Sequence, residues 1–142
     1  MDSWRKAIIE EAQDWLRTPW RHRARVKGAG VDCAQFLIGV HAGAGLIDDF
    51  DTGPYPEDWM LHGDSELFLP FIERYMKQVD APQPADVALW RFGRGFSHAA
   101  IVIDYPRIIH AYRREGAVVY GDASTHELSR RPCLFYSLKV QP

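Results

Sequence analysis

The N-terminal segment carries its apolar residues at helical spacing. Between residues 4 and 16 they recur mostly every third or fourth position, at Trp4, Ala7, Ile8, Ala12, Trp15 and Leu16, which places them on one face of a helix. Ser3 stands where an N-cap residue belongs. Thr18-Pro19 ends the pattern, because the residue before a proline disfavours helical geometry. We therefore predict a helix that follows Ser3 and stops before Thr18.

Two more helices are predicted before residue 80. One opens near Asp32-Cys33, behind the basic, glycine-containing loop 20–30, and its apolar side carries Ala34, Leu37, Ile38 and His41. Residues 46–64 are rich in Asp, Gly and Pro, which is typical of a long loop. The next helix is predicted over Glu66–Val79, with Pro70 in its first turn or at a kink. The N-terminal half is therefore predicted to be mainly helical.

The pattern changes after the turn-forming segment Pro82–Ala85. Short runs with strand-like composition follow, separated by glycine and proline. We predict strands over 86–92, 98–104, 108–112, 117–120 and 133–140. Helices first and strands later favour an α+β fold with a largely antiparallel sheet.

Composition and charge narrow the class of protein. The 142 residues are 46% hydrophobic and 25% charged, which predicts a single globular domain over 1–142. The net charge of −2 excludes a strong overall attraction to nucleic acid. No apolar run approaches the ~18 residues that cross a bilayer, so no membrane insertion is expected. The charged N-terminus lacks the apolar segment of a signal peptide, which predicts a chain that is cytoplasmic at synthesis.

Cys33 is the candidate nucleophile. It follows a Gly-Ala-Gly-Val-Asp segment and is predicted to open a helix, where unpaired N–H groups and the helix dipole favour a thiolate. The same N–H groups can hold an oxyanion on a substrate carbonyl. The alternative is a buried, inert cysteine, which is how we interpret Cys133 in its apolar strand. Free thiols are the default for these two residues, and a single bridge between them stays open.

Two histidines are candidates for the base that a thiol nucleophile needs. His98 heads one predicted strand and His110 lies in the next, with 104–107 as the turn between them. The two imidazoles lie directly opposite each other if the turn is centred on Asp104, and slide apart if it is centred later. A Cys–His pair needs a third group that orients the base. A second imidazole can do this, because its hydrogen bond fixes which nitrogen of the base carries the proton.

These residues, in this order, resemble the NlpC-like cell-wall cysteine peptidases. The resemblance covers most of the chain, from the first helix to about Tyr112. It rests on Thr18-Pro19-Trp20 with Gly30–Leu37 around the nucleophile, then on Pro84–Trp90, Ser97–Ile101 and Ile109–Ala111. Each segment is weak alone, and the four in the family's order are fairly specific.

The resemblance implies a papain-like (NlpC-type) α+β fold, with N-terminal helices packed on a largely antiparallel sheet. It implies hydrolysis of peptide bonds in bacterial peptidoglycan stem peptides, typically the γ-D-glutamyl–diamino-acid bond, with no cofactor. Carried over by position, Cys33 is the nucleophile, His98 the general base and His110 the group that orients His98. The residues it assigns to substrate binding are Asp32, Trp20 and Ser97, of which Asp32 also helps hold the loop.

The chain departs from the family pattern at two positions. Trp20 replaces a tyrosine whose hydroxyl serves the active site, and Ala85 replaces a glycine. The segment Thr18–His22 and the compact single domain look more like the phage-tail-associated branch, in which a particle carries the enzyme to the wall. This placement predicts phage-tail partner proteins and a location in a virion tail or phage-like particle.

Several alternatives stay open. The chain is either a peptidase, a structural tail-tip or assembly protein with weak or no catalysis, or an amidase or acyltransferase that uses the same thiol. No metal site is predicted, although Cys33, His98 and His110 are also a conceivable zinc set. The basic run from Arg17 to Lys27 is interpreted as a solvated loop or a carboxylate site. Tyr55 and Trp59 either pack on the core or line a groove.

Overall fold

A computed structural model describes residues 1–56 and 68–139 of the chain. Two helices, α1 (Ser3–Asp14) and α2 (Cys33–Gly43), come first, as the sequence pattern predicts. The other elements are β1 (Arg25–Val26), β2 (Gly30–Val31), α3 (Leu69–Tyr75), β3 (Met76–Val79), β4 (Val87–Phe92), β5 (Gly95–Asp104), β6 (Arg107–Tyr112), β7 (Ala117–Asp122), α4 (His126–Ser129) and β8 (Cys133–Leu138). The predicted role of Trp59 and the predicted helix start at Glu66 lie outside the described residues.

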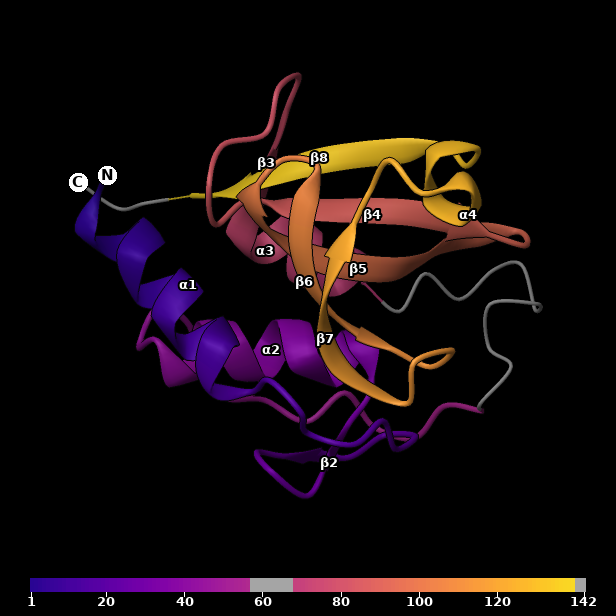
Figure 1. The fold of residues 1–142 in the computed structure, drawn as a ribbon. Coiled ribbons are helices and arrows are strands. Elements are labelled where there is room, and N and C mark those ends of the chain that lie inside the picture. Colours follow the sequence, from indigo (N-terminus) through magenta and orange to yellow (C-terminus); the bar gives the residue numbers. More distant parts are fainter. Residues whose placement is uncertain (57–67, 140–142) are drawn as a thin grey trace.

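Six strands form one antiparallel sheet in the order β3-β8-β4-β5-β6-β7. Figure 1 shows this sheet strongly twisted, with α1 and α2 on one side of it. The α+β fold with helices packed on an antiparallel sheet is therefore confirmed. The loop between α1 and α2 contains a short antiparallel pair, β1 and β2, that the sequence analysis did not predict. No helix within the described ranges is long and apolar enough to cross a membrane.

Helix α2 is buried on all sides. Every residue from Ala34 to His41 is buried, although the sequence pattern assigned only one apolar side to this helix. The reason is that the sheet covers one side of α2 while Ile8 of α1 and Phe71 of α3 belong to the core cluster that surrounds it. A helix that is apolar all round is stable only when it is enclosed in this way. The enclosure holds Cys33, the first residue of α2, in a fixed place.

A smaller apolar cluster covers the other face of the sheet. It joins Trp90, Val102 and Ile108 to Leu128 of α4. His98 lies opposite Trp90 in the β4–β5 register, so the two side chains share this face. The second cluster therefore supports the strand segment that carries the candidate base.

Two predicted element boundaries are wrong. Met76–Val79 was predicted as the end of a helix and is strand β3, paired with β8 through Met76 and Leu138. Met76 and Val79 suit a helix by their spacing of three, and pairing with a neighbouring strand overrides that local pattern. At the N-terminus the helix includes Ser3, and Asp2 holds the N-cap position without a capping side-chain hydrogen bond.

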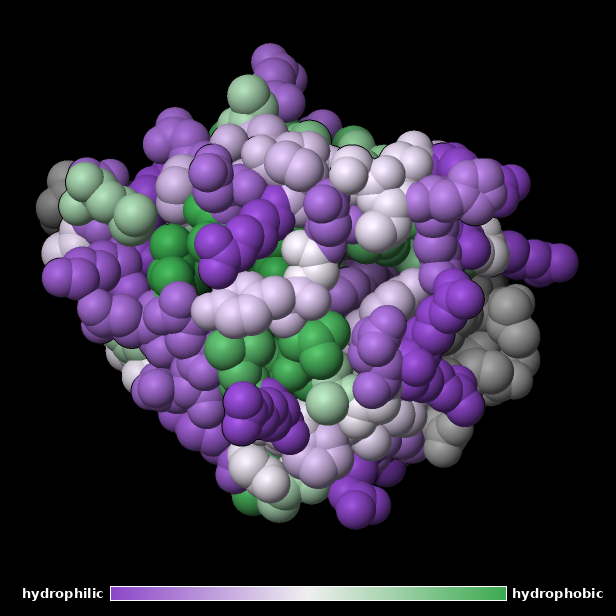
Figure 2. Space-filling model, viewed as in Figure 1, coloured by the Kyte–Doolittle hydropathy of each residue, from purple (hydrophilic) through white to green (hydrophobic). Residues whose placement is uncertain are grey.

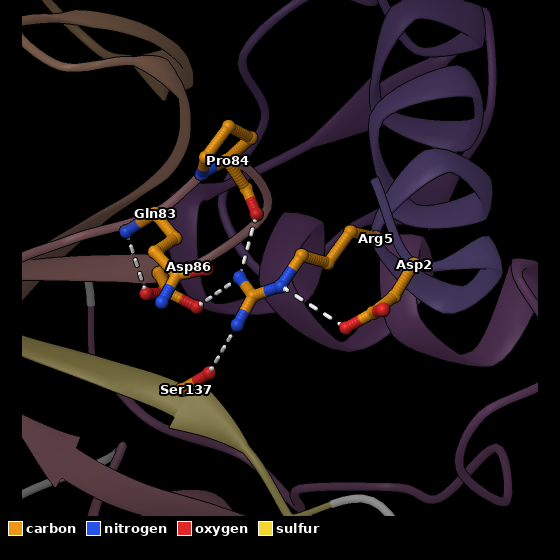
Figure 3. Close-up of polar contacts among 6 residues, drawn as sticks. All are labelled: Asp2, Arg5, Gln83, Pro84, Asp86 and Ser137. Carbon is orange, nitrogen blue, oxygen red and sulfur yellow. Dashed lines mark hydrogen bonds and ion pairs between the residues drawn. The ribbon is translucent and has the colours of Figure 1, made fainter.

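A buried arginine ties α1 to the sheet (Figure 3). The Nη1 of Arg5 lies 2.7 Å from both the Pro84 carbonyl and Oδ1 of Asp86, and its Nη2 donates to Oγ of Ser137 at 3.1 Å. The backbone N–H of Gln83 donates to the other Asp86 oxygen at 2.8 Å. Asp86 is 1% exposed, so Arg5 supplies its charge compensation. The ion pair of Arg5 with Asp86 thus links α1 to the residue before β4, and the hydrogen bond to Ser137 links α1 to β8.

His41 is expected to make folding stability sensitive to acid. It is fully buried in α2, and its Nδ1 donates to the Leu37 carbonyl at 2.7 Å. Within the described residues its Nε2 has no hydrogen-bond partner. Burial lowers the pKa of His41 to about 4, below the value of about 6.5 in an unfolded chain. Protons therefore bind the unfolded chain preferentially, and the stability present above about pH 6.5 is lost as the pH falls toward 4.

The variant His41→Leu is expected to remove this acid sensitivity. In the wild-type chain His41 contributes a loss of about 3 kcal/mol between pH 6.5 and 4. Urea unfolding of both proteins at pH 7.5 and pH 4.5 measures the change. His98 and His110 titrate in both proteins, so the variant is expected to show a smaller pH dependence. An identical pH dependence in the two proteins would contradict the assignment to His41.

Candidate active site

A cleft of about 510 Å³ brings most of the predicted site residues together. Trp20, Asp32, Cys33, Ser97 and His98 all line it. The cleft is also lined by residues to which no role was assigned from the sequence, namely His22, Phe92, Ala111, Tyr112, Arg113, Arg114 and Glu127. His110 does not line the cleft and lies in contact with His98 instead.

Cys33 opens α2, and Asp32 caps the helix. Oδ1 of Asp32 accepts the backbone N–H of Gln35 at 2.9 Å, which is the hydrogen bond of an N-cap residue. The thiol of Cys33 donates to the backbone carbonyl of Ser97 at 3.4 Å. The predicted substrate-binding residue Ser97 therefore contacts Cys33 through its backbone, while its own hydroxyl donates to the Phe92 carbonyl at 3.3 Å.

The electrostatic environment of Cys33 differs from the expectation of a thiolate. Burial raises the pKa of the Cys33 thiol far above its usual range, and the adjacent Asp32 carboxylate raises it further. Backbone N–H groups of Ala99, Ala34 and Cys33 itself act in the opposite direction without reversing the shift. The helix N-terminus is present as predicted, but desolvation of the sulfur outweighs it. The resting site therefore holds a neutral thiol at pH 7.

His98 and His110 meet across β5 and β6. The register pairs Ile101 with Ile109, so the hairpin is centred later than Asp104 and the two histidines are diagonal neighbours rather than directly opposite. Both still point to the same face, and Nε2 of His98 lies 2.8 Å from Nδ1 of His110. The predicted pairing of the imidazoles is present, although the turn that places them differs from the one that direct opposition requires.

Both imidazoles are held neutral. Burial lowers the pKa of His98 well below its usual value, and the charges of His110 and Arg131 lower it further. Burial lowers the pKa of His110 to about 4. One of the two facing nitrogens must carry the proton and the other must accept it. If Nε2 of His98 donates, its Nδ1 has a free lone pair and can take a proton from a thiol.

A hydrogen-bond network that sequence analysis missed surrounds Asp32. The Tyr55 hydroxyl donates to Oδ2 of Asp32 at 2.5 Å, and the backbone N–H of Arg23 donates to the same oxygen at 2.8 Å. His22 contacts the Tyr55 carbonyl at 2.7 Å through Nε2. Asp32 therefore holds the surrounding loops, as the resemblance implies for its position. Tyr55 packs against the core, and no sequence spacing links it to Asp32.

The other sequence-predicted features have structural partners. Trp20 lines the cleft beneath the Arg113 guanidinium, which lies 5.2 Å from the Trp20 ring. In the basic run, Arg25 pairs with Asp49 and Lys27 with Glu11, so these cations stabilise loops instead of lining the cleft. Ala85 adopts a positive φ of 76°, the conformation that favours the glycine it replaces.

The arrangement of the thiols and imidazoles bears on the disulfide and metal alternatives. Both cysteines are free, and Cys133 is half-buried against the second apolar cluster. Among the described residues no group of three His, Cys, Asp or Glu side chains is arranged to hold a metal ion. The facing nitrogens of His98 and His110 bind each other, so they do not converge on a common metal position.

Comparison with known proteins identifies the fold. No family model matches the sequence, and no curated protein matches it significantly. The NlpC/p60 domain of the peptidoglycan hydrolase SagA aligns with a TM-score of 0.60 and 20% identity, over 96% of this chain and 98% of that one. A protein from Staphylococcus aureus, described as similar to lipoprotein of the NLP/P60 family, gives a TM-score of 0.69 and 16% identity over 99% of this chain.

The proteins with this fold differ in length and in described activity. The chain spans 43% of the length of the staphylococcal protein, which is therefore much larger. RipD from Mycobacterium tuberculosis, described as a non-catalytic NlpC/p60 domain protein adapted to peptidoglycan binding, aligns with a TM-score of 0.57 and 12% identity. It is covered over its full length, 100%, by 99% of this chain. The fold thus occurs in hydrolases and in a non-catalytic protein, and this chain has the NlpC/p60 fold.

Proposed function

We propose that the chain is a cysteine peptidase that hydrolyses peptide bonds in peptidoglycan stem peptides, with the γ-D-glutamyl–diamino-acid bond as its target. The observation that carries the proposal is the hydrogen bond of 2.8 Å between His98 and His110, beside Cys33 in one cleft. Nucleophile, base and orienting group are thereby assembled on a helix end and two strands. The peptidoglycan substrate is inferred from the NlpC/p60 hydrolases that share the fold.

The first half of the mechanism forms a thioester. Because thiol and imidazole are both neutral at rest, Nδ1 of His98 takes the proton from Cys33 as the sulfur attacks the scissile carbonyl. Backbone N–H groups at the start of α2 hold the resulting oxyanion. The C–N bond then breaks, and the protonated His98 gives its proton to the leaving amine.

The second half releases the acyl product. His98 removes a proton from a water molecule, whose oxygen attacks the thioester carbonyl. The C–S bond breaks, the sulfur recovers the proton from His98, and the product leaves with a new carboxyl group. His110 keeps the His98 ring in the tautomer and orientation that both halves require.

Gly121 is expected to be essential to this orientation. A Cβ at this position would lie 2.6 Å from Nε2 and 3.2 Å from Cδ2 of His110, so Gly121→Ala must displace the ring. A misplacement of about 1 Å near reacting groups costs about 100-fold in rate, and we expect kcat to fall by roughly 10- to 100-fold.

The double variant Gly121→Ala/His110→Ala is the control for Gly121. With the imidazole removed, the added methyl group has no ring to displace, so it should lower kcat little beyond His110→Ala alone. Thermal unfolding of each variant separates a local effect from loss of the fold. A wild-type kcat in folded Gly121→Ala would contradict the orienting role of His110.

Product analysis tests the proposed bond. Defined peptidoglycan fragments that carry both sugar and stem peptide are digested and the products identified by mass spectrometry. An endopeptidase shortens the stem peptide, an amidase separates peptide from sugar, and an acyltransferase joins the acyl part to an added amine. Cleavage only between sugar and peptide would replace the proposed activity by that of an amidase.

A wall-binding or structural role is the second candidate. Trp20 stands in the cleft without the hydroxyl of the family's tyrosine, and RipD is described as a non-catalytic protein of the same fold. We also propose that the chain is associated with a phage tail, because the segment Thr18–His22 and the compact single domain resemble that branch of the family. Immunodetection of the chain in purified particles tests it, and absence from particles whose other tail proteins are detected would exclude it.

A further inference from the structure

A second cleft adjoins the candidate active site. It has a volume of about 640 Å³ and lies where α4 and the segment before β8 meet the end of the β4–β5 hairpin. Arg114 and Glu127 line both clefts, so the two spaces share a wall. Figure 2 shows hydrophilic side chains gathered over α4 and this end of the sheet. The other residues that line it are Arg91, Gly93, His126, Arg130, Arg131 and Pro132.

The charge of this arginine cleft is strongly unbalanced. Four arginines line it against one carboxylate, that of Glu127. Glu127 forms an ion pair with Arg114 at the shared wall. Arg131 also helps lower the pKa of Glu127, so it shares this one carboxylate with Arg114. Arg91 and Arg130 form no ion pair with a carboxylate among the described residues that line the cleft.

Few of the hydrogen-bond donors of these arginines bind an acceptor among the described residues. Arg130 contacts Nε2 of His126 at 2.8 Å. Arg131 donates weakly to the Arg91 carbonyl at 3.4 Å, and its Nε has no acceptor among the described residues. The guanidinium of Arg131 lies 3.7 Å from the centre of the Phe92 ring, which also lines the active-site cleft. Guanidinium groups arranged in this way suit a planar carboxylate, which they can bind through paired N–H donors.

We propose that the arginine cleft binds a carboxylate of the peptide substrate, so that the peptide extends from Cys33 across the Arg114–Glu127 wall. This inference rests on the proposed function for the identity of the peptide. It assigns Arg91 and Arg130 to recognition of the free carboxylate at the end of the peptide, away from the reacting bond. Their contribution is to affinity, since they contact no group at which charge develops during the reaction.

Binding to the inactive variant Cys33→Ala tests the proposal without requiring turnover. Calorimetry compares a stem peptide that ends in a free carboxylate with the same peptide whose terminus is amidated. In the Cys33→Ala background, Arg91→Gln/Arg130→Gln is expected to weaken binding of the free acid about 10- to 100-fold, because hydrogen bonds to charged groups are strong. Binding of the amidated peptide should not change. Equal weakening of both peptides, or of neither, would overturn the carboxylate assignment.

A matched control and a competitor identify the source of the effect. Lys6→Gln/Lys77→Gln removes the same number of positive charges from exposed positions on α1 and β3 and should leave both affinities unchanged. Guanidinium groups bind phosphate as well as carboxylate, so we expect inorganic phosphate to compete weakly with the acid peptide. Phosphate that binds more tightly than the acid peptide would overturn the proposal in favour of a phosphate-bearing ligand.

The outcome separates this inference from the proposed activity. Carboxylate-dependent binding without any cleavage by the wild-type chain would leave the arginine cleft established and remove the peptidase. Cleavage that is equally fast for the acid and amidated peptides, and unaffected by Arg91→Gln/Arg130→Gln, would establish the peptidase and overturn the role of the arginine cleft. For an active enzyme the paired substitution is expected to raise KM for the acid peptide about tenfold and leave kcat unchanged.

Discussion

Cys33→Ala is expected to abolish hydrolysis of stem peptides while the protein remains folded. The substitution removes the one protein atom that forms a covalent bond with the substrate in the proposed mechanism, and loss of a nucleophile lowers kcat by at least about 10⁴-fold. The side chain is small and lines the cleft, so its truncation should disturb little packing. Initial rates on a defined stem peptide and the thermal unfolding curve of each protein measure the two effects.

Cys133→Ala is the matched control for this loss. Cys133 is the other free cysteine, and it packs against the second apolar cluster instead of lining the active-site cleft. We expect its removal to leave the turnover rate within about twofold of wild type, since no step of the mechanism involves it. Equal loss of activity in the two variants, or undiminished activity in Cys33→Ala, would refute the assigned nucleophile.

Arg5→Ala is expected to lower the free energy of unfolding by about 3–5 kcal/mol. The substitution leaves the Asp86 carboxylate buried at 1% exposure without its cation, and it removes the donors to Pro84 and Ser137. It also releases α1 from the sheet at the point shown in Figure 3. Urea or guanidinium unfolding at pH 7 measures the change.

Lys6→Ala is the control on the same helix. Lys6 is exposed and pairs with Glu10 at 4.0 Å, and such a surface pair contributes only about 0.3–0.5 kcal/mol. The double variant Arg5→Met/Asp86→Leu should recover much of the loss, because it replaces both charges rather than leaving one unpaired. If Arg5→Ala lowers the free energy of unfolding no more than Lys6→Ala does, the Arg5–Asp86 ion pair between α1 and the sheet does not stabilise the fold.

The sequence allowed the fold class to be predicted, together with the proximity of Cys33, His98 and His110 in the folded chain. Apolar spacing located α1 and α2, because helix periodicity and a breaking proline are local signals. The resemblance to NlpC-like peptidases then selected the two histidines from six in the chain. The sequence left the register of the two histidines open. In the structure both imidazoles lie on one face, and the hairpin turn is centred later than direct opposition requires.

The features that sequence analysis missed depend on contacts between distant segments. Tyr55 reaches Asp32 across 23 positions, and Arg5 reaches Asp86 across 81. The end of the predicted helix at Met76 became a strand because β8 pairs with it. The protonation state of Cys33 also depends on distant segments. The helix N-terminus can be predicted from the sequence, whereas the burial of the sulfur that outweighs it cannot.

The most direct test of the account is hydrolysis of a defined stem peptide in ¹⁸O-enriched water by the wild-type chain. The thioester mechanism predicts two products, with one heavy oxygen in the new carboxyl group of the acyl product and none in the amine product. The same reaction with Cys33→Ala should return the intact peptide. An unchanged peptide with the wild-type chain, or cleavage that persists in Cys33→Ala, would contradict the claim that Cys33, His98 and His110 form a hydrolytic site.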